Sequence, residues 1–68
     1  MNEHYTIYII DEDRYDTDIE IILYNKEEAT QGFFLACELA KLNKYGKITV
    51  KLYNSNTNQI MLTESFRA

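Results

Sequence analysis

Residues 25–46 read NKEEATQGFFLACELAKLNKYG, and this stretch carries both the start and the stop signals of one helix. Asn25 is a preferred N-cap residue, and Glu28 stands three residues later, where a capping box requires a carboxylate. Glu27 and Glu28 also lie at the positive end of the helix dipole. Gly46 is the residue type that ends helices in the left-handed conformation. The sequence therefore predicts a helix over residues 26–44 that Gly46 terminates.

The segments on both sides of this helix have the composition of β-strands. Residues 5–10 and 18–24 are rich in β-branched and aromatic side chains. Residues 47–53 alternate strictly between polar and apolar, and the turn-forming run 54–58 separates them from a last strand over 59–66. The order is ββαββ. We predict an α+β fold in which a four-stranded antiparallel sheet carries one helix, packed on one face.

The chain has 68 residues, so we predict a single small domain over residues 1–68. Ordering it costs on the order of 100 kcal/mol, and apolar burial returns roughly 105 kcal/mol, so the two terms nearly cancel. Domains this small usually gain stability from disulfides, a metal or a partner. Cys37 and His4 are the only residues of their types, which excludes an intrachain disulfide and a structural zinc. We therefore expect no cofactor, and stabilisation by a partner or a homo-oligomer.

A single helix covers only one face of the sheet, and the composition of the other face is informative. Strand alternation places a set of large side chains there: Tyr8, Ile10, Ile22, Tyr24, Tyr53 and Met61. One interpretation is that a partner covers this face. The other is that tyrosine and β-branched residues are there because they favour strands.

The apolar residues of the helix form two adjacent stripes that together span roughly 220° of its circumference, wider than a surface helix needs. The first stripe contains Ala29, Phe33, Ala36, Cys37 and Ala40, and the second contains Leu35, Leu39 and Leu42. Phe33 is expected in the core. Phe34 lies outside the arc and, with Tyr45, is either an interface anchor or a single exposed aromatic.

Residues 10–20 read IDEDRYDTDIE and hold six carboxylates and one arginine. Residues 1–28 contain nine acidic and two basic residues, whereas residues 29–68 contain two acidic and five basic ones. The stretch does not match an EF-hand calcium loop. Such a loop needs an oxygen ligand, a glycine and a glutamate at the positions that Tyr15, Asp16 and Ile22 occupy here. A hairpin tip also lacks the low-dielectric cleft that paired catalytic carboxylates need. We therefore expect no metal site and no enzymatic activity.

The remaining interpretation of the acidic stretch is electrostatic. Asp18 and Glu20 are expected on one side of a strand, about 6.7 Å apart, with Asp16 extending the row. Such a row can occupy a pocket made for phosphates, and Arg14 would set its register. The predicted partner-binding residues are Asp11, Glu12, Asp13, Tyr15, Asp16, Asp18, Glu20, Phe34 and Tyr45. The alternative is a solvated loop that protects the sheet edge from aggregation.

Two functional hypotheses follow. The first is a small acidic inhibitor or adaptor that binds a basic protein surface, such as a phage-encoded anti-defence antagonist and nucleic-acid mimic. The second is an assembly protein that forms a homodimer or larger homo-oligomer through its open sheet face or an edge strand. Direct nucleic-acid binding through Lys41, Lys44, Lys47 and Lys51 is weaker, because the net charge is −4. The lone thiol and the lack of an apolar leader predict a cytoplasmic protein, in the host cytoplasm if phage-encoded, with no membrane contact.

Overall fold

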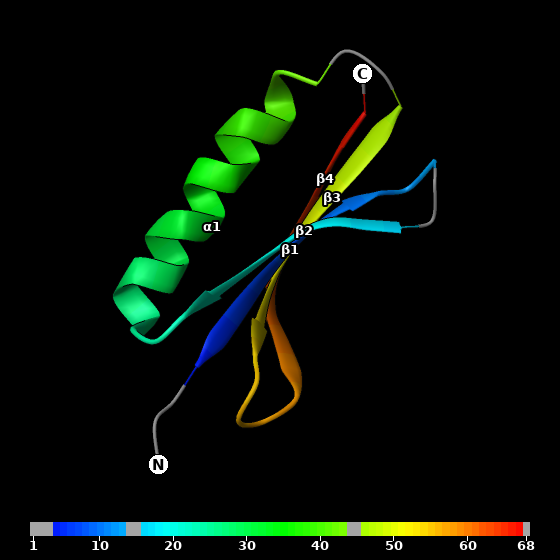
Figure 1. The fold of residues 1–68 in the computed structure, drawn as a ribbon. Helices are drawn as coiled ribbons and strands as arrows, with labels where there is room; N and C mark the ends of the chain where they lie inside the picture. Colours follow the sequence, from blue (N-terminus) through cyan, green and yellow to red (C-terminus); the bar gives the residue numbers. More distant parts are fainter. Residues whose placement is uncertain (1–3, 14–15, 44–45, 68) are drawn as a thin grey trace.

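The computed structural model describes residues 4–13, 16–43 and 46–67, and for residues 16–18 it describes the backbone only. Within these residues the elements follow the predicted ββαββ order (Figure 1). Their bounds are β1 Tyr5–Asp11, β2 Asp16–Leu23, α1 Lys26–Lys41, β3 Lys47–Asn54 and β4 Gln59–Arg67. All strand pairs are antiparallel, and the helix packs on one face of the sheet. The predicted α+β fold is confirmed.

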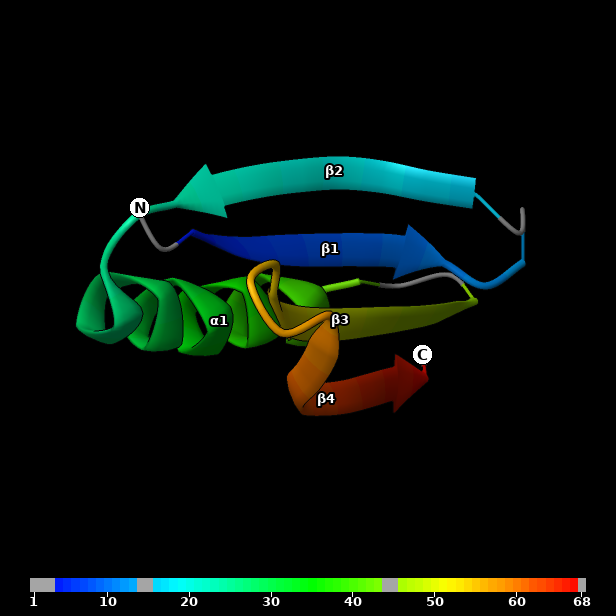
Figure 2. The ribbon, with the colours of Figure 1, turned by 90° about the horizontal axis from the view of Figure 1, so that it is seen from below.

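The strand order is β2-β1-β3-β4, so β1 and β3 are central while β2 and β4 form the two edges (Figure 2). Ile7 of β1 pairs with Leu52 of β3, and Ile9 pairs with Val50. Directly opposed residues of an antiparallel pair share one face of the sheet. These pairs therefore form the floor on which the helix rests.

The core lies between α1 and the two central strands. Its buried apolar members are Tyr5, Ile7, Ala29, Phe33, Ala36, Cys37, Ala40, Val50 and Leu52. Phe33 is only 1% exposed, which confirms its predicted place in the core. The helix side of this core consists of small residues apart from Phe33. A Cβ added to Gly32 would lie 3.0 Å from Cδ1 of Ile7, so the helix backbone approaches the sheet closely here.

The helix begins as predicted and ends earlier than predicted. The Asn25 side-chain oxygen accepts hydrogen bonds from the backbone N–H of Glu27 at 2.8 Å and of Glu28 at 3.1 Å. The helix ends at Lys41, with Leu42 as its C-cap, rather than at residue 44. The Leu42 N–H donates to the Leu39 carbonyl at 3.1 Å, so the last turn tightens and closes before Gly46 is reached.

Gly46 has a left-handed φ of +71°, but it lies just before β3 and not directly after the helix. The Asp13 carboxylate of the β1–β2 hairpin occupies the space that a Cβ on Gly46 would take. The lack of a side chain at Gly46 therefore allows the hairpin to lie close to the segment before β3. The prediction that Gly46 stops the helix did not include this role.

Gly46→Ala is expected to lower the free energy of unfolding by about 1–2 kcal/mol, because alanine disfavours this backbone conformation and its Cβ displaces Asp13. Urea denaturation followed by circular dichroism measures the change. In an Asp13→Ala background the steric part of the loss should disappear and the backbone part should remain. A Gly46→Ala protein more stable than wild type would contradict this account.

Two β-bulges shift the alternation of the edge strands. In β2, Ile9 pairs with Ile19 while Ile10 pairs with Thr17, so Asp18 is the extra residue. In β4, Leu52 of β3 pairs with Leu62 while Tyr53 pairs with Ile60, so Met61 is the extra residue. The prediction that Met61 lies on the open face is therefore wrong. It packs against the core cluster instead, and Ile60 takes the open-face position opposite Tyr53.

Candidate protein interface

The helix buries its alanines and exposes its leucines. Ala29, Ala36 and Ala40 are buried. Leu35, Leu39 and Leu42, which form the second stripe, are 66%, 67% and 73% exposed. The physical reason is that the small residues of the first stripe draw the helix close over β1 and β3. The second stripe then faces outward, where Leu39 and Leu42 line a groove together with Ile19 of β2, and no element of the described chain covers the three leucines.

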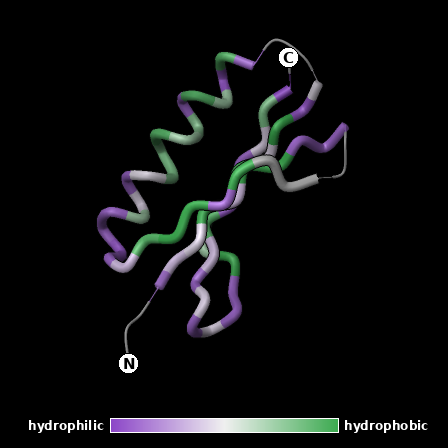
Figure 3. Tube along the Cα trace, viewed as in Figure 1, coloured by the Kyte–Doolittle hydropathy of each residue, from purple (hydrophilic) through white to green (hydrophobic). Residues whose placement is uncertain are grey.

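Edge strand β2 presents apolar side chains beside these leucines. The β1–β2 register places Ile19 opposite Ile9 and Ile21 opposite Ile7, on the same face as the helix. Nevertheless Ile19 is 48% exposed and Ile21 is 39% exposed, because the helix does not reach the edge of the sheet. Ile19, Ile21, Leu35, Leu39 and Leu42 are together called the α1–β2 flank. Figure 3 shows the hydrophobic tube segments of α1 and of the strands.

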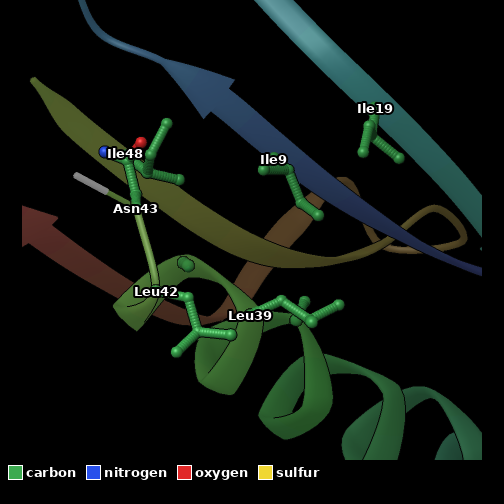
Figure 4. A pocket seen from close by; sticks show the side chains of 8 residues that line it. Ile9, Ile19, Leu39, Leu42, Asn43 and Ile48 are labelled. Carbon is green, nitrogen blue, oxygen red and sulfur yellow. The ribbon is translucent and has the colours of Figure 1, made fainter. Parts of the chain in front are cut away.

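A groove of about 330 Å³ lies within this flank, at the C-terminal end of the helix (Figure 4). Its lining residues are Ile9, Ile19, Ala36, Leu39, Ala40, Leu42, Asn43 and Ile48. Only Asn43 among them has a polar side chain, so the groove offers no acid, base or nucleophile. Such a lining suits the apolar side chains of another protein segment.

A second hollow of about 240 Å³ lies on the other side of the helix, against β4. It is lined by Phe34, Cys37, Glu38, Lys41, Glu64 and Phe66. Phe34 is 56% exposed and points away from the core, as expected, while its ring still meets Phe33 edge-on at 5.6 Å between centroids. Lys41 Nζ donates to Glu38 Oε1 at 3.0 Å. Tyr45 lies outside the described residues, so its place beside Phe34 stays a prediction.

The Cys37 thiol in this hollow is buried, and burial is the main cause that raises its pKa above the ordinary value. The Glu64 carboxylate raises the pKa of Cys37 further. Less thiolate is therefore present at neutral pH in the folded than in the unfolded chain. We expect a disulfide reagent such as DTNB to react with native Cys37 at least about 10-fold more slowly than in 8 M urea, an effect of thiolate fraction and access. Equal rates at pH 7.5 would contradict the burial.

The first part of the acidic stretch has structural roles in the hairpin. The Asp13 N–H donates to Asp11 Oδ1 at 3.0 Å, which forms a local side-chain turn. The Glu12 N–H donates to the Lys47 carbonyl at 3.0 Å and ties the hairpin to the start of β3. Arg14 and Tyr15 lie outside the described residues. The binding roles predicted for these residues stay predictions.

The expected row of evenly spaced carboxylates does not fit the backbone of β2. The bulge at Asp18 interrupts the two-residue spacing, so Asp16 pairs with Asp11 while Glu20 pairs with Tyr8. The side chains of Asp16 and Asp18 lie outside what the structure describes. Glu20 is exposed, and Lys51 flanks Tyr8 from its other side, so a positive charge shares this face with Glu20. The partner-binding role of the three carboxylates stays a prediction.

The open face of the sheet is less apolar than strand alternation suggests. The hydroxyl groups of Thr6 and Ser55 form a hydrogen bond of 3.1 Å, and those of Thr49 and Ser65 form one of 3.0 Å. Tyr8 meets Tyr53 edge-on at 6.2 Å between ring centroids. In the central part of the open face, these side chains therefore find hydrogen-bond and ring partners within the chain itself. The α1–β2 flank gathers five exposed large apolar side chains, and the sequence indicated it only through the unusual width of the helical apolar arc.

No protein-family model, curated protein sequence or solved structure matches this chain. Among the described residues, no group of three or more metal-ligating side chains comes together. Within the same residues, no helix combines the length and hydrophobicity needed to cross a bilayer. The geometry of the described surface is therefore the basis for a functional proposal.

Proposed function

We propose that this protein is a small protein-binding module whose contact surface is the α1–β2 flank. The observation that supports this proposal is the inverted packing of α1, which buries alanines and exposes Leu35, Leu39 and Leu42. A leucine side chain gains about 1.5–3 kcal/mol when it is fully buried. A partner that covered these three leucines with Ile19 and Ile21 would recover a large part of this free energy.

The inhibitor or adaptor role fits the same surface as a more specific form of this proposal. Ile9 and Ile19 are the last apolar pair before the acidic hairpin, so a partner seated in the groove would lie beside Asp11, Glu12 and Asp13. Carboxylates next to an apolar groove accelerate association with a basic partner. This acceleration becomes smaller as the salt concentration rises, because salt screens the charges. In this proposal the protein acts in the cytoplasm and performs no reaction of its own.

A photo-crosslinking residue in place of Leu39 tests the contact in the source cells. Leu39 is expected to give a discrete protein adduct, because it stands at the centre of the flank. A matched reporter at Thr57, which is exposed in the β3–β4 turn, serves as the control. Absence of an adduct at Leu39, or equal adducts at both positions, would contradict the proposal.

Leu39→Lys should leave the fold intact, with a change in unfolding free energy within about 0.5 kcal/mol, because the side chain is already exposed. The same change should abolish the adduct of a reporter placed at Leu35, since a charge in the contact must be desolvated on binding. Thermal denaturation and crosslinking yield are the two measurements. A Leu35 adduct that persists undiminished would show that the flank is not the contact.

A further inference from the structure

Strand β2 is an edge strand that presents Ile19 and Ile21 on the helix side of the sheet and Ile22 beside Glu20 on the open side. Its outer backbone N–H and C=O groups have no neighbouring strand in the described chain. Between Ile19 and Leu23 its pairing with β1 is regular, and Glu20 is the one charged residue of this segment. Natural edge strands are usually protected by lysine, proline or a bulge. Here the bulge lies at Asp18, beyond one end of the regular segment, and leaves the segment free to pair.

The other edge strand has the protection that β2 lacks. In β4 the bulge at Met61 separates the two exposed apolar residues, Ile60 and Leu62, which are 53% and 38% exposed, and polar or charged exposed residues follow Leu62. These residues are Thr63, Glu64, Ser65 and Arg67. Of the two edges, β2 is therefore the one suited to pairing with another strand.

We propose that β2 pairs antiparallel with β2 of a second copy of this chain, about a two-fold axis at Ile21. The two sheets then form one continuous sheet, and the two α1–β2 flanks face each other across the axis. This inference rests on the proposed function of the flank as a protein interface, and it takes a second copy of this chain, in place of a basic partner, as the occupant of the flank.

The register follows from charge and from side-chain alternation. Residues opposite each other across an antiparallel pair must point to the same face, so an axis passes through a residue pair. An axis at Glu20 would set two carboxylates directly opposite each other, which is destabilising. An axis at Ile21 instead sets Glu20 opposite Ile22 and Ile19 opposite Leu23. It also aligns the exposed isoleucines of both chains on the helix side.

The α1–β2 flank exposes on the order of 500 Å², a large part of the roughly 800 Å² per partner that a specific interface buries. Ile22, which is 50% exposed on the open face of β2, adds to this apolar area. Self-pairing through β2 would therefore draw on an apolar area of the same order as a specific interface.

Sedimentation velocity of the purified chain between about 1 and 300 µM is the first test, because a dimer must dissociate on dilution by mass action. A dimer is expected, and Ile21→Glu should raise its dissociation constant at least 100-fold. The matched variant Thr63→Glu, on edge strand β4, should leave the dissociation constant within about 3-fold of wild type. Circular dichroism should show both variants folded. A wild-type chain that is monomeric at every concentration would overturn the proposal.

Disulfide trapping tests the register in a Cys37→Ala background. Ile21→Cys should form a disulfide-linked dimer on mild oxidation, because the two copies of residue 21 lie within the roughly 7 Å between Cα atoms that a disulfide requires. Ile19→Cys, on the same face, should not form one, since its two copies lie about 14 Å apart along the strands. Trapping at residue 19 and not at residue 21 would overturn the register.

The two proposals can fail separately. A monomeric chain whose Leu39 reporter crosslinks to a different protein would overturn the dimer and support the flank as an interface. A monomeric chain with no adduct at Leu39 would overturn both. A dimer that Ile21→Glu leaves unchanged would overturn pairing through β2.

Discussion

Phe33→Ala is expected to unfold the domain or to leave it only partly folded at 25 °C. Phe33 is the largest fully buried side chain and joins α1 to the central strands. Truncating a buried phenylalanine costs about 3–5 kcal/mol through lost burial and the cavity left behind. A domain of this length has little more than that to lose. Far-ultraviolet circular dichroism during urea denaturation measures the loss.

Phe34→Ala is the matched control, since it removes the same side chain from the adjacent position. Phe34 is more than half exposed, so its truncation should change the free energy of unfolding by less than about 1 kcal/mol. Equal losses for the two variants would show that the helix is not oriented as the structure has it. The pair therefore tests the rotation of α1 about its own axis.

Gly32→Leu is expected to destabilise the protein by about 2 kcal/mol or more, although leucine is the better helix former. A Cβ at this position already lies 3.0 Å from Cδ1 of Ile7 and 3.2 Å from Cδ1 of Leu23. The further carbons of leucine would have to displace Ile7, which is fully buried, and so push the helix away from the sheet. The midpoint of urea denaturation should fall accordingly.

Two controls separate close packing from helix propensity. Gln31→Leu adds the same side chain at the neighbouring exposed position and should change stability by less than about 0.5 kcal/mol. Gly32→Ala should stay within about 1 kcal/mol of wild type, because its gain in helix propensity offsets the tight contact of one methyl group. A Gly32→Leu protein as stable as wild type would mean that α1 does not approach the sheet closely.

The local elements followed from the sequence because each has a local physical cause. Alternation in residues 47–53 predicted β3, and the β-branched runs predicted β1 and β2. Asn25 predicted the start of the helix, and its side chain accepts the expected hydrogen bonds. The three-residue spacing of the apolar positions placed Phe33 in the core and Phe34 outside it. All of these depend on interactions within a few residues of the chain.

Tertiary structure decided the features that depend on contacts between distant segments. The bulges at Asp18 and Met61 arise from pairing with neighbouring strands. Strand alternation alone therefore assigned Met61 to the wrong face and predicted evenly spaced carboxylates along β2. The role of Gly46 depends on Asp13, which approaches it from another hairpin.

The sequence by itself determined that α1 has two apolar stripes and that Phe33, in the first of them, belongs to the core, and only the tertiary structure decided that the second stripe stays exposed. Hydrophobicity would favour Leu35, Leu39 and Leu42 over Ala29, Ala36 and Ala40 for the core. The smaller residues are buried because they allow the helix backbone to approach Ile7 closely, while Phe33 packs in the same core cluster as Val50 and Leu52. One helix centred over β1 and β3 then leaves edge strand β2 uncovered. The leucines stay exposed for this reason, and the candidate interface exists only in the folded chain.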